Sequence, residues 1–195
     1  IVERTEQAQQ QLQDQLAGAP KQIADAQTAL QRLLAAPQDD PSQRLAQASV
    51  SELEHLLSER NLELRALQKD LGEANTLIVT AQTRPERAQA EISSNQTRIQ
   101  EINTLLKSAK EGSKFFSSEK IDLLKAEVLA LESKNNLRRA ELAGNSVLQE
   151  LGSHRKDFLL NKVRLQEQAI LALQSLLNEK RQADSEKTVA ELALE

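Results

Sequence analysis

Histidine and carboxylate side chains are the first candidates for chemistry in this chain, because they bind metal ions and transfer protons. The two histidines, His55 and His154, lie far apart in the sequence, whereas a zinc site needs three or four ligands brought together. Asp39 and Asp40 form an adjacent acidic pair, but they lack the alternating oxygen ligands and the glycine of a calcium loop. We therefore predict surface histidines, a solvated acidic loop and no metal site.

Nucleophilic catalysis has no more support in the sequence than metal chemistry. The chain contains no cysteine, which excludes thiol catalysis and disulfide bonds. We find no Ser-His-Asp order, no carboxylate pair in a cleft, no phosphate-binding glycine loop and no dinucleotide fingerprint. We therefore predict a protein that is not an enzyme, with no catalytic, cofactor-binding or metal residues, no cofactor and no small-molecule substrate.

Polar and aromatic residues at unusual places are the remaining candidates. Asn95 and Asn135 stand where an apolar residue would continue a hydrophobic row, and they could line a ligand channel or fix the register between helices. We favour register, the better attested use of a lone polar residue in a helix contact. Phe115 and Phe116 could tuck over the end of a bundle or be presented to a partner or a membrane. We favour the tucked position, since a buried ring contributes roughly 1.5 to 3 kcal/mol.

The elements that must position these residues are long amphipathic helices. Apolar residues recur in alternating steps of four and three, which places one narrow apolar seam along a helix. One such row consists of Leu53, Leu57, Arg60, Leu64, Leu67, Leu71, Ala74, Ile78 and Ala81. Aromatic residues make up only 2% of the chain, too few for a thick globular core. We predict an all-α fold, an elongated antiparallel helical bundle or coiled coil of about five long helices.

Cap signals set the predicted helix boundaries at about residues 1–36, 50–82, 84–109, 119–143 and 147–192. The seam keeps its phase across Pro20, so we expect one helix kinked near that residue. Ser49 and Glu52 form a capping box at the start of the second helix.

Two of these predicted boundaries depend on short junctions. Thr83 and Pro85 resemble a helix start, which predicts antiparallel neighbours on either side, although a continuous helix stays open as an alternative. Gly144 and Asn145 resemble a helix end with the glycine in the left-handed conformation.

The chain shows no sign of division into separate domains. No Gly-rich, Pro-rich or Ser-rich linker interrupts residues 1–195, so we predict a single helical domain. The last predicted helix carries two apolar stripes and should therefore lie in a three-helix cross-section for part of its length.

Charge and hydropathy exclude two other classes of function. The net charge is −4 and no basic stripe is present, which argues against nucleic-acid binding. No apolar run reaches the roughly 18 to 20 residues that span a bilayer. Ile1 is not a start methionine, and we expect the chain to be an excised piece of a longer protein.

Three stretches carry a family resemblance. They are residues 82–87 (QTRPER), residues 142–149 (LAGNSVLQ) and residues 178–181 (NEKR) leading to residues 186–188 (EKT). They resemble the N-terminal periplasmic region of large bacterial mechanosensitive channels, most of all the potassium-dependent MscK or KefA type of the small-conductance channel superfamily. The resemblance covers most of the chain in order.

The resemblance implies a role outside the membrane. It implies a periplasmic domain of a homo-oligomeric bacterial inner-membrane channel that releases solutes on osmotic downshock, with a signal peptide upstream and the pore downstream. The implied partners are the rest of the channel polypeptide and its sister subunits, with a cell-envelope component as a further candidate. The domain would contribute to regulation, envelope coupling or assembly. Two alternatives stay open: the coiled-coil hairpin of an envelope adaptor or efflux component, and a generic coiled-coil scaffold.

Overall fold

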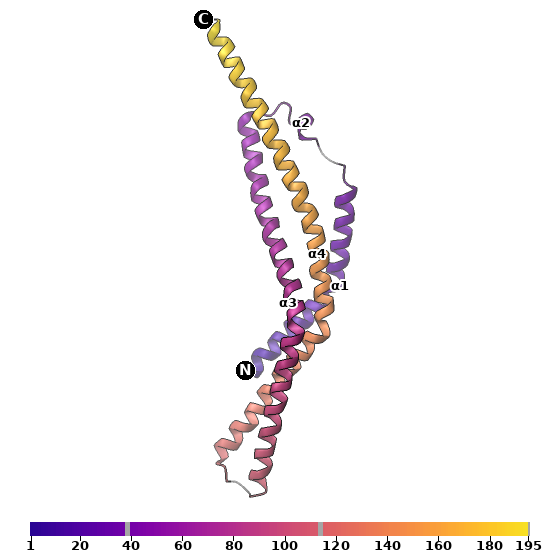
Figure 1. Ribbon diagram of the computed structural model, residues 1–195, viewed down its shortest axis with the longest axis vertical. Helices are drawn as coiled ribbons and strands as arrows, with labels where there is room; N and C mark the ends of the chain where they lie inside the picture. Colours follow the sequence, from indigo (N-terminus) through magenta and orange to yellow (C-terminus); the bar gives the residue numbers. More distant parts are fainter. Residues whose placement is uncertain (38–39, 113–114, 195) are drawn as a thin grey trace. The chain divides into compact units, whose positions relative to one another are not determined.

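The computed structural model describes residues 1–37, 40–112 and 115–194, and these residues form helices without any strand. In chain order the elements are α1 (Val2–Ala35), α2 (Pro41–Arg44), α3 (Val50–Lys110) and α4 (Ser118–Ala193), as Figure 1 shows. The predicted all-α fold is confirmed. The prediction of about five long helices is wrong, because the described residues form three long helices of 34, 61 and 76 residues and a short one of 4.

The described residues divide into two compact units, and each long helix contributes to both. The first unit contains Ile1–Ile23 and Thr76–Gly152, and the second contains Ala24–Asn75 and Ser153–Glu195. The expectation of one domain over residues 1–195 stays a prediction, and the two units are described separately below.

The start of α3 follows the capping box that the sequence predicts. The backbone N–H of Ser49 donates to Glu52 Oε2 at 2.7 Å, and the backbone N–H of Glu52 donates to Ser49 Oγ at 3.2 Å. These bonds satisfy two amides that have no partner within the helix. They also lower the pKa of the Glu52 carboxyl, because the Ser49 amide donates to its charged form.

The predicted junction at Thr83 is wrong, because α3 continues through it with Pro85 inside the helix. Thr83 Oγ1 donates to the carbonyl oxygens of Val79 at 3.1 Å and Thr80 at 3.4 Å. The hydroxyl therefore bonds back to the preceding turn instead of capping a following helix. Residues 50–82 and 84–109 therefore belong to one continuous helix, which was the alternative left open by the sequence, and they cannot be antiparallel neighbours.

The predicted helix end at Gly144 is also wrong, because α4 runs unbroken from Ser118 to Ala193. The glycine with a positive φ among the described residues is Gly112, at 78°, just after α3 ends at Lys110. Its amide donates to the carbonyl oxygen of Ala109 at 3.3 Å. The break that the sequence predicts near Gly112 is thus confirmed, whereas Gly144 has another role.

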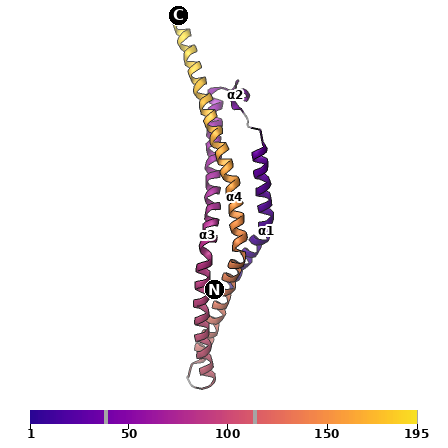
Figure 2. The ribbon, with the colours of Figure 1, turned by 45° about the vertical axis from the view of Figure 1, so that its right-hand side comes forward.

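In the first unit, α3 packs antiparallel against α4 and α1 packs parallel to α4. Ala81 of α3 pairs with Asn145 of α4. Asn95, which comes later in α3, pairs with Asn135, which comes earlier in α4, so the two helices are antiparallel. The two helices lie side by side towards the turn that joins them in both views (Figure 1 and Figure 2). The hydroxyls of Thr5 and Ser133 are hydrogen-bonded between α1 and α4.

A small apolar core holds the three helices of this unit together. Its buried residues are Ala19, Ile23 and Leu151, with Leu77 and Val147 packed against them. Leu151 is completely buried. This part of α4 therefore lies in the three-helix cross-section that its double stripe predicts.

In the second unit, two apolar clusters join α3 to α4. The first consists of Leu67, Ala74 and Leu159 with partly buried neighbours, and the second consists of Leu53, Leu173, Leu176 and Leu177. Lys180 Nζ donates to the carbonyl oxygens of Ala46 and Ala48, at 2.6 Å each. The lysine thus ties α4 to the segment between α2 and α3, and beyond it residues 181–194 are exposed.

Candidate functional site

The two histidines considered for metal binding contact different residues. His55 Nε2 is 3.2 Å from Glu59 Oε1 on the exposed side of α3. His154 Nε2 is 3.4 Å from Gln27 Nε2. In the described parts of the chain, no three histidine, aspartate or glutamate side chains are grouped to hold a metal ion.

Asp40 has a structural role as the N-cap of α2, whereas Asp39 lies outside the described residues. Asp40 Oδ1 accepts hydrogen bonds from Ser42 Oγ at 2.6 Å and from the Ser42 amide at 2.9 Å. These donors favour the charged form and lower the pKa of the Asp40 carboxyl.

The two phenylalanines differ from each other at the turn between α3 and α4. Phe115 is 97% exposed, so the expectation that it tucks over the bundle end is wrong. Phe116 is partly buried. A single exposed ring is common on protein surfaces and does not by itself define a binding site.

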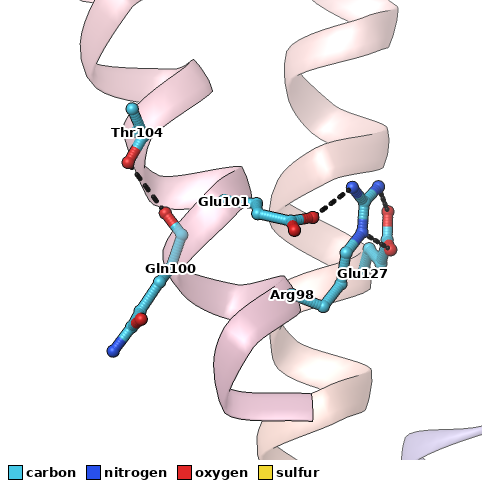
Figure 3. A network of polar contacts seen from close by, with 5 residues as sticks. All are labelled: Arg98, Gln100, Glu101, Thr104 and Glu127. Carbon is cyan, nitrogen blue, oxygen red and sulfur yellow. Dashed lines mark hydrogen bonds and ion pairs between the residues drawn. The ribbon is translucent and has the colours of Figure 1, made fainter. Parts of the chain in front are cut away.

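An ion pair links α3 to α4 close to their turn, as Figure 3 shows. Arg98 Nε and Nη2 donate to the two oxygens of Glu127 at 2.7 and 3.1 Å, and Nη1 donates to Glu101 Oε2 at 3.3 Å. The guanidinium matches the carboxylate with two parallel bonds. The hydrogen bonds from Arg98 lower the pKa of Glu127, and those to Glu127 and Glu101 raise the pKa of Arg98.

A second ion pair and an asparagine pair lie between the same helices. Arg138 Nε donates to Glu91 Oε2 at 2.5 Å, and its Nη1 donates to Glu141 at 3.0 Å. Asn95 Nδ2 donates to Asn135 Oδ1 at 2.9 Å, and Asn135 is only 2% exposed. The two seam asparagines thus pair with each other, which is the geometry that a register role requires.

Gly144 of α4 faces Leu16 of α1 in the first unit. A Cβ atom on Gly144 would overlap Leu16 Cδ1 and would lie 2.7 Å from Leu16 Cδ2. Any side chain here would therefore displace Leu16. Gly144 is required for the space it leaves, and not for its backbone conformation.

Asn145 joins the same point of α4 to α3. Its Nδ2 donates to the carbonyl oxygen of Ala81 at 2.6 Å, and both residues are buried. Its Oδ1 is buried without a hydrogen-bond partner. We call Leu16, Ala81, Gly144 and Asn145 the three-helix contact, since they come from α1, α3 and α4.

Two buried polar residues were not singled out as sites from the sequence. The sequence places Asn145 at a predicted helix end and indicates no site role for Gln166. Gln166 Nε2 donates to the carbonyl oxygen of Arg60 at 2.9 Å and to Glu63 Oε2 at 2.9 Å. An amide that interrupts an apolar row could have indicated a buried polar contact. The pairing of Asn95 with Asn135 shows that this pattern does mark such contacts.

These contacts define the class of protein: an α-helical packing module in which buried amides and ion pairs fix how the helices fit together. No helix in the described ranges is both long enough and apolar enough to cross a membrane.

Comparison with protein families identifies the module. Residues 2–195 match the family described as the mechanosensitive ion channel porin domain. The match spans almost the whole chain, and the chain belongs to this family.

Two relatives were found among curated proteins. The chain is 29% identical over 192 residues to the mechanosensitive channel MscK of Escherichia coli (strain K12), which covers 97% of this chain and 17% of that protein. It is 30% identical over 137 residues to an uncharacterized MscS family protein of Haemophilus influenzae (strain ATCC 51907 / DSM 11121 / KW20 / Rd), covering 70% of this chain and 12% of the relative. The chain thus spans less than a fifth of either relative. No solved structure matches it.

Proposed function

We propose that this chain is a periplasmic, non-catalytic domain of a mechanosensitive channel in the bacterial inner membrane. The observation that carries the proposal is the family match over residues 2–195, together with the relative named as the channel MscK. The domain contributes to regulation, envelope coupling or assembly of a channel that releases solutes on osmotic downshock. It does not itself conduct ions.

The physical basis of the role is the way the helices are held. Polar contacts connect α3 to α4 within each unit: Arg98 pairs with Glu127 in the first unit, and Gln166 bonds to Arg60 in the second. Helices fixed in this way can pass a displacement along their axes. A partner biases a gate only if it binds the closed and open states differently. The partners are the rest of the channel polypeptide and its sister subunits, with a cell-envelope component as a further candidate.

Deletion of this domain from the full-length parent tests the regulatory part of the proposal. Patch-clamp recording should show a tension-gated conductance that persists while its threshold, its dependence on external potassium or its assembly changes. Unchanged threshold, potassium dependence and expression would overturn the regulatory role. Total loss of conductance in a properly assembled truncation would place the domain within the gate itself.

The compartment can be tested separately, because the chain contains no cysteine. Single cysteines at the exposed positions Ser58 and Ser185 would be introduced into a parent freed of other cysteines. A membrane-impermeant maleimide should label both in intact cells whose outer membrane has been permeabilised. Labelling only after the inner membrane is lysed would refute the periplasmic location and favour the cytoplasmic scaffold.

A further inference from the structure

Pro85 leaves one carbonyl of α3 without its usual helical partner. In an α-helix, each carbonyl accepts a hydrogen bond from the amide four residues later. The residue four positions before Pro85 is Ala81, and proline has no N–H to donate. The turn after Ala81 therefore lacks a bond in the middle of a helix that continues to Lys110.

The carbonyl of Ala81 cannot recover this bond from solvent, because Ala81 is only 2% exposed. A buried carbonyl without a donor is strongly unfavourable. The donor comes instead from α4, whose Asn145 Nδ2 lies 2.6 Å from the Ala81 oxygen. The bond that α3 cannot make within itself is thus made between helices.

The position of Asn145 in α4 is itself tightly constrained. The residue before it, Gly144, accommodates the side chain of Leu16 from α1. Asn145 is 9% exposed, and its Oδ1 has no partner. An apolar side chain could fill this space without burying an unpaired oxygen. An amide side chain that supplies an N–H group always brings an oxygen atom as well.

We propose that Asn145 is a latch for α3: its side-chain N–H replaces the backbone N–H that Pro85 lacks. The turn of α3 at residues 81–85 then stays closed only while α4 is docked against it at this level. Movement of α4 away from α3 removes the donor and lets this turn open. The latch rests on contacts within the first unit and not on the proposed channel function.

The test is a double-mutant cycle between Asn145 and Pro85. Asn145→Leu keeps the branched shape of the side chain and removes the donor, and Pro85→Ala returns a backbone amide that Ala81 can use. Hydrogen exchange of peptides that cover residues 78–90 reports opening of α3 at this turn. Asn136→Leu, at an exposed position of α4, controls for the change in helix propensity.

With Pro85 present, Asn145→Leu should accelerate exchange in this segment roughly tenfold, the effect of losing one net hydrogen bond. In the Pro85→Ala background, the same substitution should leave exchange unchanged or slow it. Equal acceleration in both backgrounds would overturn the latch and assign Asn145 a packing role, and so would no acceleration in either.

A second readout covers the case in which Asn145→Leu prevents folding. Pro85→Ala alone should slow exchange across residues 78–90, because α3 then makes its own bond to Ala81. If Pro85→Ala restores folding to Asn145→Leu, the latch is supported. Failure of the double variant to fold, with Pro85→Ala itself folded, would overturn it.

Discussion

Gly112 and Gly144 look alike in the sequence, since each lies between two predicted helices, but they have different roles in the structure. Gly112 follows the end of α3 with a φ of 78° and open space where a Cβ would lie. Gly144 lies inside α4 with an ordinary helical conformation, and Leu16 occupies the space of its missing side chain. One glycine is needed for its backbone and the other for its size.

The comparison shows what a glycine signal in a helical sequence can and cannot decide. A left-handed residue ends a helix, whereas a helical glycine lets a neighbouring helix approach. Both produce the same letter in the sequence. The distinction depends on a residue of α1, Leu16, that is far from Gly144 along the chain.

The largest effect is expected at Gly144. Gly144→Val should lower the free energy of unfolding by about 2 kcal/mol or more, because the added carbons overlap Leu16 and force it out of the three-helix contact. Chemical denaturation followed by circular dichroism measures the change. Gly72→Val is the matched control, since nothing lies within 4 Å of a Cβ at that helical position. Equal losses at both positions would contradict the role of Leu16, because valine is a better helix former than glycine and nothing crowds position 72.

A smaller loss is expected at Gly112. Gly112→Ala should destabilise the chain by about 1 kcal/mol, because an alanine resists the positive φ at the end of α3. Gly112→Asn should cost less, since asparagine tolerates this conformation better. Thermal unfolding of the three proteins would show the order, and an alanine variant at least as stable as the asparagine variant would contradict it.

A small gain is expected at Gly72. Gly72→Ala should stabilise the chain by up to about 1 kcal/mol, because alanine is the better helix former and the added methyl meets nothing. A rise in the midpoint of urea unfolding with an unchanged slope would confirm this. A loss of stability would indicate a neighbour that the contact geometry does not show.

Much of the helical content followed from the sequence, including one helix across Pro20, while the continuity of α3 and α4 did not. The alternating steps predicted the seams, and Ser49 with Glu52 predicted the start of α3. Asn95 and Asn135 were each predicted to fix register, but their pairing with each other was not foreseen. Local signals failed at Thr83 and Gly144, because a capping motif reflects only the hydrogen bonds and conformations that are available within one helix. The partners that keep the helices continuous come from other helices, as Asn145 does for Ala81.

The smallest effect concerns the ion pair near the α3–α4 turn and depends on pH. Bonding to Arg98 holds the folded-state pKa of Glu127 below its ordinary value of 4.5. Its contribution to stability is therefore present above pH 4.5 and lost as the pH falls through the lower folded-state value. Glu127→Gln should flatten the loss of stability below pH 4.5, measured by thermal unfolding. A matched variant, Glu119→Gln, lies on the exposed start of α4 and provides the comparison. Identical slopes for the parent and Glu127→Gln would contradict the prediction.

The most direct test of the role assigned to Gly144 is the free energy of unfolding of Gly144→Ala with and without Leu16→Ala. With Leu16 present, Gly144→Ala should destabilise the chain, because the new methyl overlaps the leucine. In the Leu16→Ala background, the overlap is gone and the better helix propensity of alanine should make the same change stabilising, by up to about 1 kcal/mol. A reversal of sign is the predicted result. The same change in both backgrounds would contradict the account, because Gly144 would then not be there to admit Leu16.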